Sequence, residues 1–130
     1  MTSAHNAIPD VVLRFIEENI DTVPELETLL MMRQAEDRGW DVSEIAARNY
    51  ISEQRAQETL EALRRRGLLS LDAEARRYRF EPPADETRAL VAEVAETYQR
   101  NLARIAMLIH SKPSSSIKEF ARAFDLKKDR

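Results

Sequence analysis

The chain has 130 residues, of which 43% are hydrophobic, and this length and composition allow one modest hydrophobic core. It contains no cysteine, so disulfides, thiolate metal sites and a cysteine nucleophile are excluded. The formal net charge of -3 gives no overall signal for nucleic acid, and any basic surface for DNA must therefore be local. Because long apolar runs and a basic-then-apolar leader are lacking, we expect a soluble, cytoplasmic protein that does not enter the membrane.

Two helices are predicted before residue 40. Pro9 suits the first turn of a helix that runs to about residue 20. Thr22 and Glu25 have the spacing of a capping box and begin a second helix, which runs to about residue 36 and is ended by Gly39. Trp40 follows; a lone tryptophan beside a helix start is typical of the core, although a stacking role is the alternative. The apolar positions that recur at helical spacing are Val12, Phe15, Ile16, Ile20, Leu26, Leu29 and Leu30.

The stretch from 41 to 66 predicts two short helices joined by a turn. Asp41 and Glu44 form a second capping box that opens a helix over about 42–49. Ser52 is a good N-cap for the next helix, and Glu53 stands in its first turn, where the positive helix end favours an acid. Gly67 supplies the left-handed residue that commonly ends a helix.

A hairpin is predicted directly after Gly67. Residues 68–71 and 78–80 are rich in apolar or alternating residues, and a polar segment, 72–77, lies between them. Pro82 and Pro83 then end the second strand because proline cannot donate to a ladder. The short segment around Trp40 is expected to add a third edge to this hairpin.

Together these residues resemble the winged helix-turn-helix of MarR-like bacterial regulators over about residues 22–82. In that family a capped helix is followed by a serine, a second helix with apolar residues at fixed offsets, then Arg-Gly-Leu and a wing. The matching positions here are Ser43, Glu44, Ile45, Ala46, Ser52, Ala56, Leu60, Leu63, Arg66, Gly67 and Leu68. The resemblance implies a mostly α fold with a small β-hairpin wing, and a homodimeric transcription regulator that binds double-stranded DNA.

The expected DNA contacts come from the second helix and the wing. Arginine and glutamine can read base edges in the major groove, and arginines on the wing can grip phosphates. The arginines at 64–66 are further candidates for phosphate contacts, or else interact with the helix end and keep the surface soluble. The candidate DNA-binding residues are Ser52, Gln54, Arg55, Gln57, Arg76 and Arg77.

The outer face of the same helix is acidic, which favours an alternative. From 53 to 61 the acids are Glu53, Glu58 and Glu61, and the one base is Arg55, so this stretch has a net charge of -2. Phosphate is repelled by such a face. The alternative function is therefore a winged-helix adaptor that binds a protein partner and no DNA.

One long helix is predicted from 85 to 111, because this stretch has neither glycine nor proline. Such a helix would be roughly 40 Å long, too long for one small core to cover, so we expect it to pair two chains. The alternative is that it folds back on the chain's own N-terminal helices. The expected dimer contacts, including two from the last segment, are Val91, Val94, Tyr98, Leu102, Ile105, Ile109, Phe120 and Phe124.

The last segment, 112–130, combines a hinge with a short amphipathic helix. Lys112-Pro113-Ser114-Ser115-Ser116 is the hinge, and Ser116 with Glu119 forms a capping box. The helix predicted after it has an apolar face of Ile117, Phe120, Ala121 and Phe124. This face is expected to dock on the partner subunit, in the groove of another protein or on an acidic surface.

No catalytic, cofactor or metal site is predicted. His5 and His110 stand in a polar terminus and near a helix end, and the chain has only two glycines, so a histidine metal pair and a phosphate-binding loop are not expected. The carboxylates are scattered as solvated groups, and we expect no enzyme. Four parts are predicted: 1–21, tail and helix; 22–83, winged helix-turn-helix; 84–111, dimerisation helix; 112–130, hinge and terminal helix.

Overall fold

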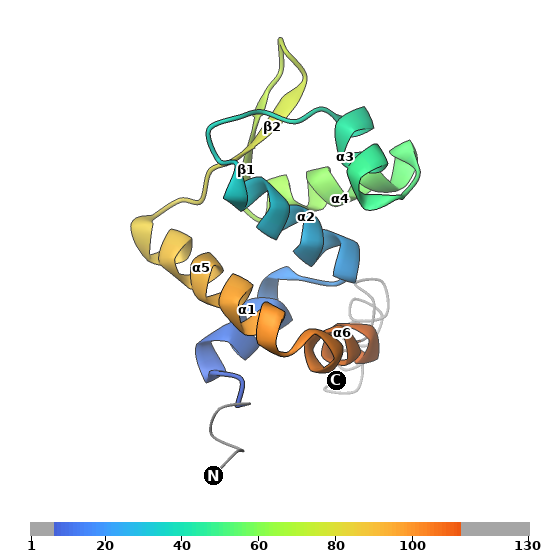
Figure 1. Ribbon diagram of the computed structural model, residues 1–130. Coiled ribbons are helices and arrows are strands. Elements are labelled where there is room, and N and C mark those ends of the chain that lie inside the picture. The colour runs from blue at the N-terminus through green and yellow to red at the C-terminus, as the bar shows by residue number, and fades with distance from the viewer. Residues whose placement is uncertain (1–6, 113–130) are drawn as a thin grey trace, which may run out of the picture.

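The computed structural model describes residues 7–112, which form a mostly helical fold with one small antiparallel sheet. The hairpin projects at one end of the molecule, and the last described helix lies at the opposite end (Figure 1). The elements are, in chain order, α1 (Asp10–Asn19), α2 (Val23–Gln34), α3 (Val42–Asn49), α4 (Glu53–Arg65), β1 (Leu69–Asp72), β2 (Arg77–Phe80), α5 (Asp85–Arg100) and α6 (Leu102–Ser111).

The predicted caps begin three of these helices. The Thr22 hydroxyl accepts a hydrogen bond from the Glu25 N–H at 3.1 Å, which starts α2. At α3 the capping box is complete, since the Asp41 carboxylate accepts from the Glu44 N–H at 2.8 Å and the Glu44 carboxylate accepts from the Asp41 N–H at 3.0 Å. The Ser52 hydroxyl accepts from the Arg55 N–H at 3.0 Å and starts α4. Local sequence therefore fixes where these helices begin.

The hairpin pairs β1 with β2 so that Leu69 lies opposite Phe80. It follows α4 directly, because Gly67 has the left-handed φ of 81° that the sequence predicts. Trp40 adds the expected third edge, with its N–H and carbonyl each bonded to the main chain of Tyr78 at 2.8 Å. This bridge ties the segment before α3 to the hairpin.

The core lies where α2 packs against α3, α4, β2 and α6, while α1 packs against α5. Trp40 is 3% exposed and belongs to this core, as expected, with the Arg38 guanidinium 3.6 Å from its ring centroid. The largest side chains with almost no exposed surface are Ile20, Leu26, Leu29, Met32, Ile45, Leu60, Leu63, Ile105 and Ile109. One core thus joins the N-terminal helices to the last two.

The prediction that Gly39 ends α2 was wrong. The helix ends at Gln34, and Ala35 already has non-helical backbone angles. The space around Gly39 gives it another role, since a Cβ at this position would lie 2.9 Å from the Cβ of Arg77. A glycine is thus needed where the chain passes beside the hairpin.

The prediction of a single helix from 85 to 111 was also wrong, because Asn101 divides it into α5 and α6. Asn101 is buried, has φ -135° and ψ 40°, and its side-chain amide donates to the Thr97 carbonyl at 3.1 Å. Asparagine disfavours helix interiors because its side chain competes for nearby backbone groups. The break turns α6 away from the line of α5 (Figure 1).

This break changes what the predicted dimer residues contact. Val91, Val94, Tyr98, Ile105 and Ile109 are buried in the core of a single chain, against its own helices. The Tyr98 hydroxyl donates to Glu27 of α2 at 3.2 Å, and burial, with the nearby Glu27 charge, raises the pKa of Tyr98 to about 12. The expectation that these five residues form a surface between two chains is therefore corrected: the fold-back alternative describes them.

The other three predicted dimer residues have different positions. Leu102 is 54% exposed at the start of α6. Phe120 and Phe124 lie outside the described residues, as does the predicted terminal helix.

Candidate functional site

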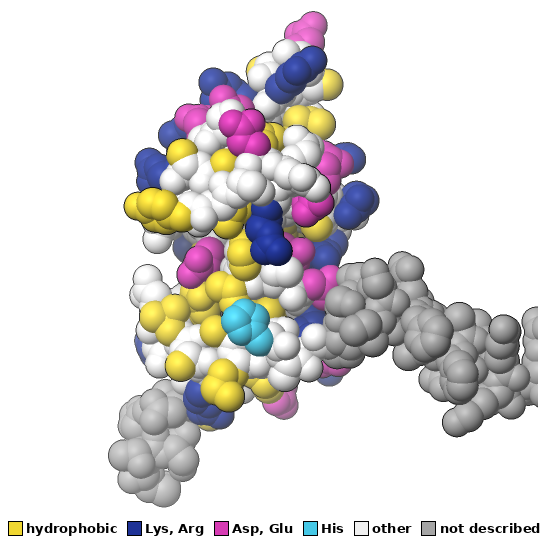
Figure 2. All heavy atoms as spheres, turned by 90° about the vertical axis from the view of Figure 1, so that its right-hand side faces the viewer, with side chains coloured by type: hydrophobic (Ala, Val, Ile, Leu, Met, Phe, Trp, Pro, Cys, Tyr) yellow, Lys and Arg dark blue, Asp and Glu magenta, His cyan; other side chains and the backbone are white. Residues whose placement is uncertain are grey.

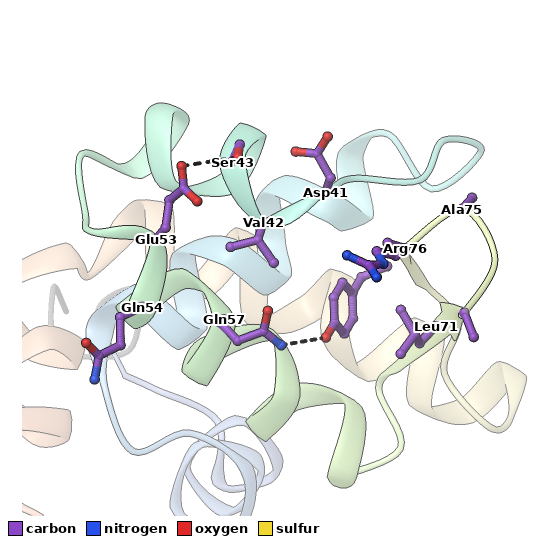
Figure 3. A pocket seen from close by; sticks show the side chains of 11 residues that line it. Asp41, Val42, Ser43, Glu53, Gln54, Gln57, Leu71, Ala75 and Arg76 are labelled. Carbon is purple, nitrogen blue, oxygen red and sulfur yellow. Dashed lines mark hydrogen bonds between the residues drawn. The ribbon is translucent and has the colours of Figure 1, made fainter.

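A groove lies between the start of α3, the first half of α4 and the hairpin. It encloses about 860 Å³, and in Figure 3 the side chains that line it come from all three elements. The lining residues are Asp41, Val42, Ser43, Glu53, Gln54, Gln57, Leu71, Ala73, Ala75, Arg76 and Tyr78. Four of the six predicted DNA-binding residues are exposed at the N-cap and on the first two turns of α4, namely Ser52, Gln54, Arg55 and Gln57.

The first half of α4 reaches the surface because its buried side faces inward at helical spacing. Ala56, Leu60 and Leu63 are fully buried, and Thr59 is 4% exposed. The hydrophobic contacts of these side chains fix the rotation of the helix. The polar side chains between them consequently face solvent beside the hairpin.

Tyr78 joins α4 to the hairpin. Its hydroxyl accepts a hydrogen bond from the Gln57 side chain at 3.0 Å, drawn as a dashed line in Figure 3, and donates to the Glu61 carboxylate at 2.5 Å. The Arg64 guanidinium donates to Glu61 as well, at 2.8 and 3.1 Å. These bonds hold the hairpin at a fixed distance from α4 and so set the width of the groove.

The same contacts shift two pKa values. Hydrogen bonds from Arg64 and then Tyr78 lower the pKa of Glu61 from 4.5 to about 2. Burial, followed by the hydrogen bond to Glu61, raises the pKa of Tyr78. The carboxylate therefore stays ionised and the phenol stays neutral across the physiological range, and the junction is intact there.

Acidic groups line the side of the groove formed by the helices. Glu53 accepts a hydrogen bond from the Ser43 hydroxyl at 3.2 Å, and the Asp41 carboxylate caps α3. Arg76 is the basic residue among the lining side chains. The groove itself is thus slightly acidic.

The two predicted wing arginines differ. Arg76 has a left-handed φ of 54° and lines the groove, with its side chain directed from the hairpin toward α3 in Figure 3. Arg77 instead pairs with Glu44 at 3.1 Å, and the Gly39 carbonyl accepts from it at 3.4 Å. The bond from the Asp41 N–H, with Arg38 and Arg77, lowers the pKa of Glu44 and keeps this pair charged. Only Arg76 lines the groove.

Two of the three arginines at the end of α4, Arg64 and Arg66, form ion pairs within the chain. Arg66 pairs with Asp21 at 2.9 Å and with Glu25 at 2.7 Å, and donates to the Asn19 carbonyl at 2.5 Å. Since Arg66 is only partly exposed, these bonds hold the turn between α1 and α2 against α4. Arg66 therefore has a structural role, and Arg64 is engaged by Glu61, which leaves neither free to bind phosphate.

Two of the three arginines predicted to contact DNA remain available. Neither Arg55 nor Arg76 forms an ion pair with another residue in the range 7–112, and both are exposed. Sequence reasoning selected these two correctly as exposed side chains. It placed Glu61 on the acidic outer face but did not predict its bond to Tyr78, although the alternation along β2 marks Tyr78 as an inward-facing residue.

Other kinds of site were sought over the same part of the chain. Among the described residues no group of three or more histidine or acidic side chains is arranged to hold a metal ion. None of the helices that residues 7–112 form is long and apolar enough to cross a membrane. Comparisons with models of known protein families, with curated proteins and with solved structures found no match to this chain.

Proposed function

We propose that the chain is a winged helix-turn-helix protein that binds double-stranded DNA and regulates transcription as a homodimer, like the MarR-like regulators that it resembles. In this proposal α3 and α4 are the helix-turn-helix and the hairpin is the wing. The observation that carries it is the exposed first half of α4 beside the groove, because recognition helices contact base edges with their N-terminal residues.

The exposed side chains have suitable chemistry for this role. Arg55 can pair with guanine and Gln54 with adenine through two hydrogen bonds each. Arg76 stands on the opposite side of the groove, where it can contact a phosphate of the adjacent backbone. The N-terminal end of α4 carries the positive end of the helix dipole, which favours phosphate and partly offsets the charge of Glu53.

We expect the affinity for DNA to depend only weakly on salt concentration, because few arginines are available to neutralise phosphates. Of the three arginines in the predicted DNA-binding set, Arg55 and Arg76 form no ion pair in the described part of the chain. Each phosphate that is neutralised contributes about -0.9 to the slope of log affinity against log salt. We therefore expect a slope of roughly -2 per chain, or about -4 for a dimer.

The first experiment measures binding of the purified protein to pooled fragments of its own genome across a salt series. Arg76→Ala is expected to weaken binding to all fragments and to reduce the slope by about 1 per chain. Arg55→Ala is expected to relax the choice among fragments, because it removes a base contact. Arg77→Ala is the matched control on the hairpin, since its guanidinium already pairs with Glu44. Retention that is absent at low salt, with the protein folded, would refute DNA binding.

A second candidate function is an adaptor that uses the same groove for a protein partner. It is favoured by the acidic groups Asp41 and Glu53 in the groove and by the engagement of Arg64, Arg66 and Arg77 within the chain. Glu53→Gln with Glu58→Gln separates the two functions. DNA affinity should increase when this repulsion is removed, whereas a basic protein ligand should bind less tightly.

A further inference from the structure

The outer side of α6 is apolar and lies exposed. Met107 is 71% exposed, Leu102 54% and Leu108 40%, while Ile105 and Ile109 are the buried residues of the helix. Apart from Arg104 and His110, its sequence has no basic or acidic side chain. Helices that are hydrophobic on most sides are normally covered, so this helix needs a second contact besides the core.

Helical spacing gathers part of this surface on one flank. Leu102, Ala103, Ala106, Met107 and His110 follow one another at intervals of one, three, one and three residues, which places them on one side of the helix. We call these five residues the α6 flank. Figure 2 shows hydrophobic side chains gathered on the lower part of the face that is turned toward the viewer.

Lys112 fixes the point at which the chain leaves α6. Its ammonium donates to the carbonyls of Ile16 at 2.9 Å, Glu17 at 2.8 Å and Ile20, at the C-terminal end of α1. It also lies 3.4 Å from the carboxylate of Asp21. The described part of the chain consequently ends at a defined place beside the C-terminal end of α1, and 18 residues follow Lys112.

We propose that the segment 116–125 folds back on the α6 flank of the same chain as an antiparallel helix. Its sequence supplies a matching apolar face through Ile117, Phe120, Ala121 and Phe124. The stretch 117–124 as a helix spans roughly 12 Å, about the length of the stretch 102–110. The three residues from 113 to 115 are enough for the reversal, as in other helical hairpins. This inference does not depend on the proposed function.

Two physical effects favour the segment of the same chain over other occupants. A short tether gives it an effective concentration in the millimolar range, above that of a second protein molecule in dilute solution. An antiparallel arrangement also brings the positive end of the new helix to the negative end of α6. The fold-back places residue 121 beside residue 106.

The test uses engineered cysteine pairs in the full-length protein, which has no natural cysteine. Ala106→Cys is combined with Ala121→Cys, which lies in the apolar face of the segment, or with Ala123→Cys as the matched control. Residues 121 and 123 are about 160° apart on a helix, so only the first can face α6. These substitutions leave Met107, Phe120 and Phe124 in place, and circular dichroism checks that each variant is folded.

The expected result is that the 106–121 pair forms a disulfide within one chain at least about tenfold faster than the 106–123 pair, because disulfides require closely spaced Cα atoms. Phe120→Asp with Phe124→Asp should remove the difference. Equal rates for the two pairs would overturn the proposal. Covalent dimers on a non-reducing gel would overturn it too, because they would assign the segment to the α6 flank of a second chain.

Discussion

The position of the hairpin depends on a few polar side chains rather than on the hairpin's own strands. Tyr78 is buried at its ring and bonded at its hydroxyl to both Gln57 and Glu61 of α4. Two-stranded hairpins are marginally stable alone, so attachment to a neighbouring helix is needed. Glu61 is the charged member of this junction, and its ionisation links the geometry of the groove to pH.

Glu61→Gln is expected to make the free energy of unfolding change less with pH between about pH 2 and pH 4.5. The folded-state pKa of Glu61, about 2, lies below its ordinary value of 4.5, so the unfolded chain binds more protons between these values. The stabilising contribution is fully present above about pH 4.5 and is lost as the pH falls toward 2. Urea unfolding of the wild type and the variant from pH 2 to 7 measures this difference. Glu58→Gln is the control, because Glu58 is exposed and its carboxylate is bonded to neither an arginine nor Tyr78 in the described part of the chain; it accepts a hydrogen bond from the Gln54 side chain at 3.5 Å. Equal slopes in wild type and Glu61→Gln would contradict the assignment.

At the level of elements, the C-terminal end of α1 is capped by the side chain of Lys112, the last described residue. α1 has no basic residue in its last turn, and the Lys112 ammonium donates to three carbonyls there. Cations near a helix C-terminus are stabilised by its dipole. Because α6 packs on α2, these bonds also hold the end of α6 beside the turn between α1 and α2.

Lys112→Met is expected to lower the free energy of unfolding by about 1–3 kcal/mol, because the Glu17 and Ile20 carbonyls lose the ammonium donor, while the Ile16 carbonyl keeps its bond from the Ile20 N–H. Chemical denaturation gives this difference directly. Arg100→Met is a suitable comparison, since its side chain is 69% exposed and lies 3.7 Å from Glu96. Exposed pairs of this kind contribute about 0–1 kcal/mol. A loss no greater than that of Arg100→Met would show that Lys112 does not cap α1.

At the level of the whole molecule, the last two helices complete the core of one chain. The apolar stripe that predicts a dimer helix faces inward after the break at Asn101, where Ile105 and Ile109 meet α2 and the rest of the core. A homodimer remains a prediction, and it requires a surface other than this stripe. The exposed α6 flank and the hairpin groove are separate from these buried residues.

Ile105→Ala is expected to lower the free energy of unfolding by about 2–5 kcal/mol, the usual loss for a large aliphatic side chain in a core. The loss should be the same at low and high protein concentration, because the contacts of Ile105 lie within one chain. Thermal unfolding at two concentrations a hundredfold apart measures this. If the loss shrinks as concentration rises, Ile105 contributes to an interface between chains.

The sequence alone determined the elements whose signals are local. The starts of α2, α3 and α4, the left-handed Gly67 and the hairpin were predicted because caps, turns and apolar periods act between residues only a few positions apart. The same reasoning identified Arg55 and Arg76 as exposed basic residues near α4 and the hairpin. It erred at Gly39, where the neighbouring Arg77 leaves no room for a Cβ, and at Asn101, which is buried in the folded chain.

Only the tertiary structure decided which arginines form ion pairs within the chain and which apolar side chains are buried. Arg66 and Arg77 have the same chemistry as Arg55 and Arg76, yet each is engaged by an acid distant in sequence. Likewise Ile105 and Met107 are two positions apart in one helix, but the first is buried and the second is exposed. Pairing and burial depend on the distances between elements, and these distances are set when the elements pack together.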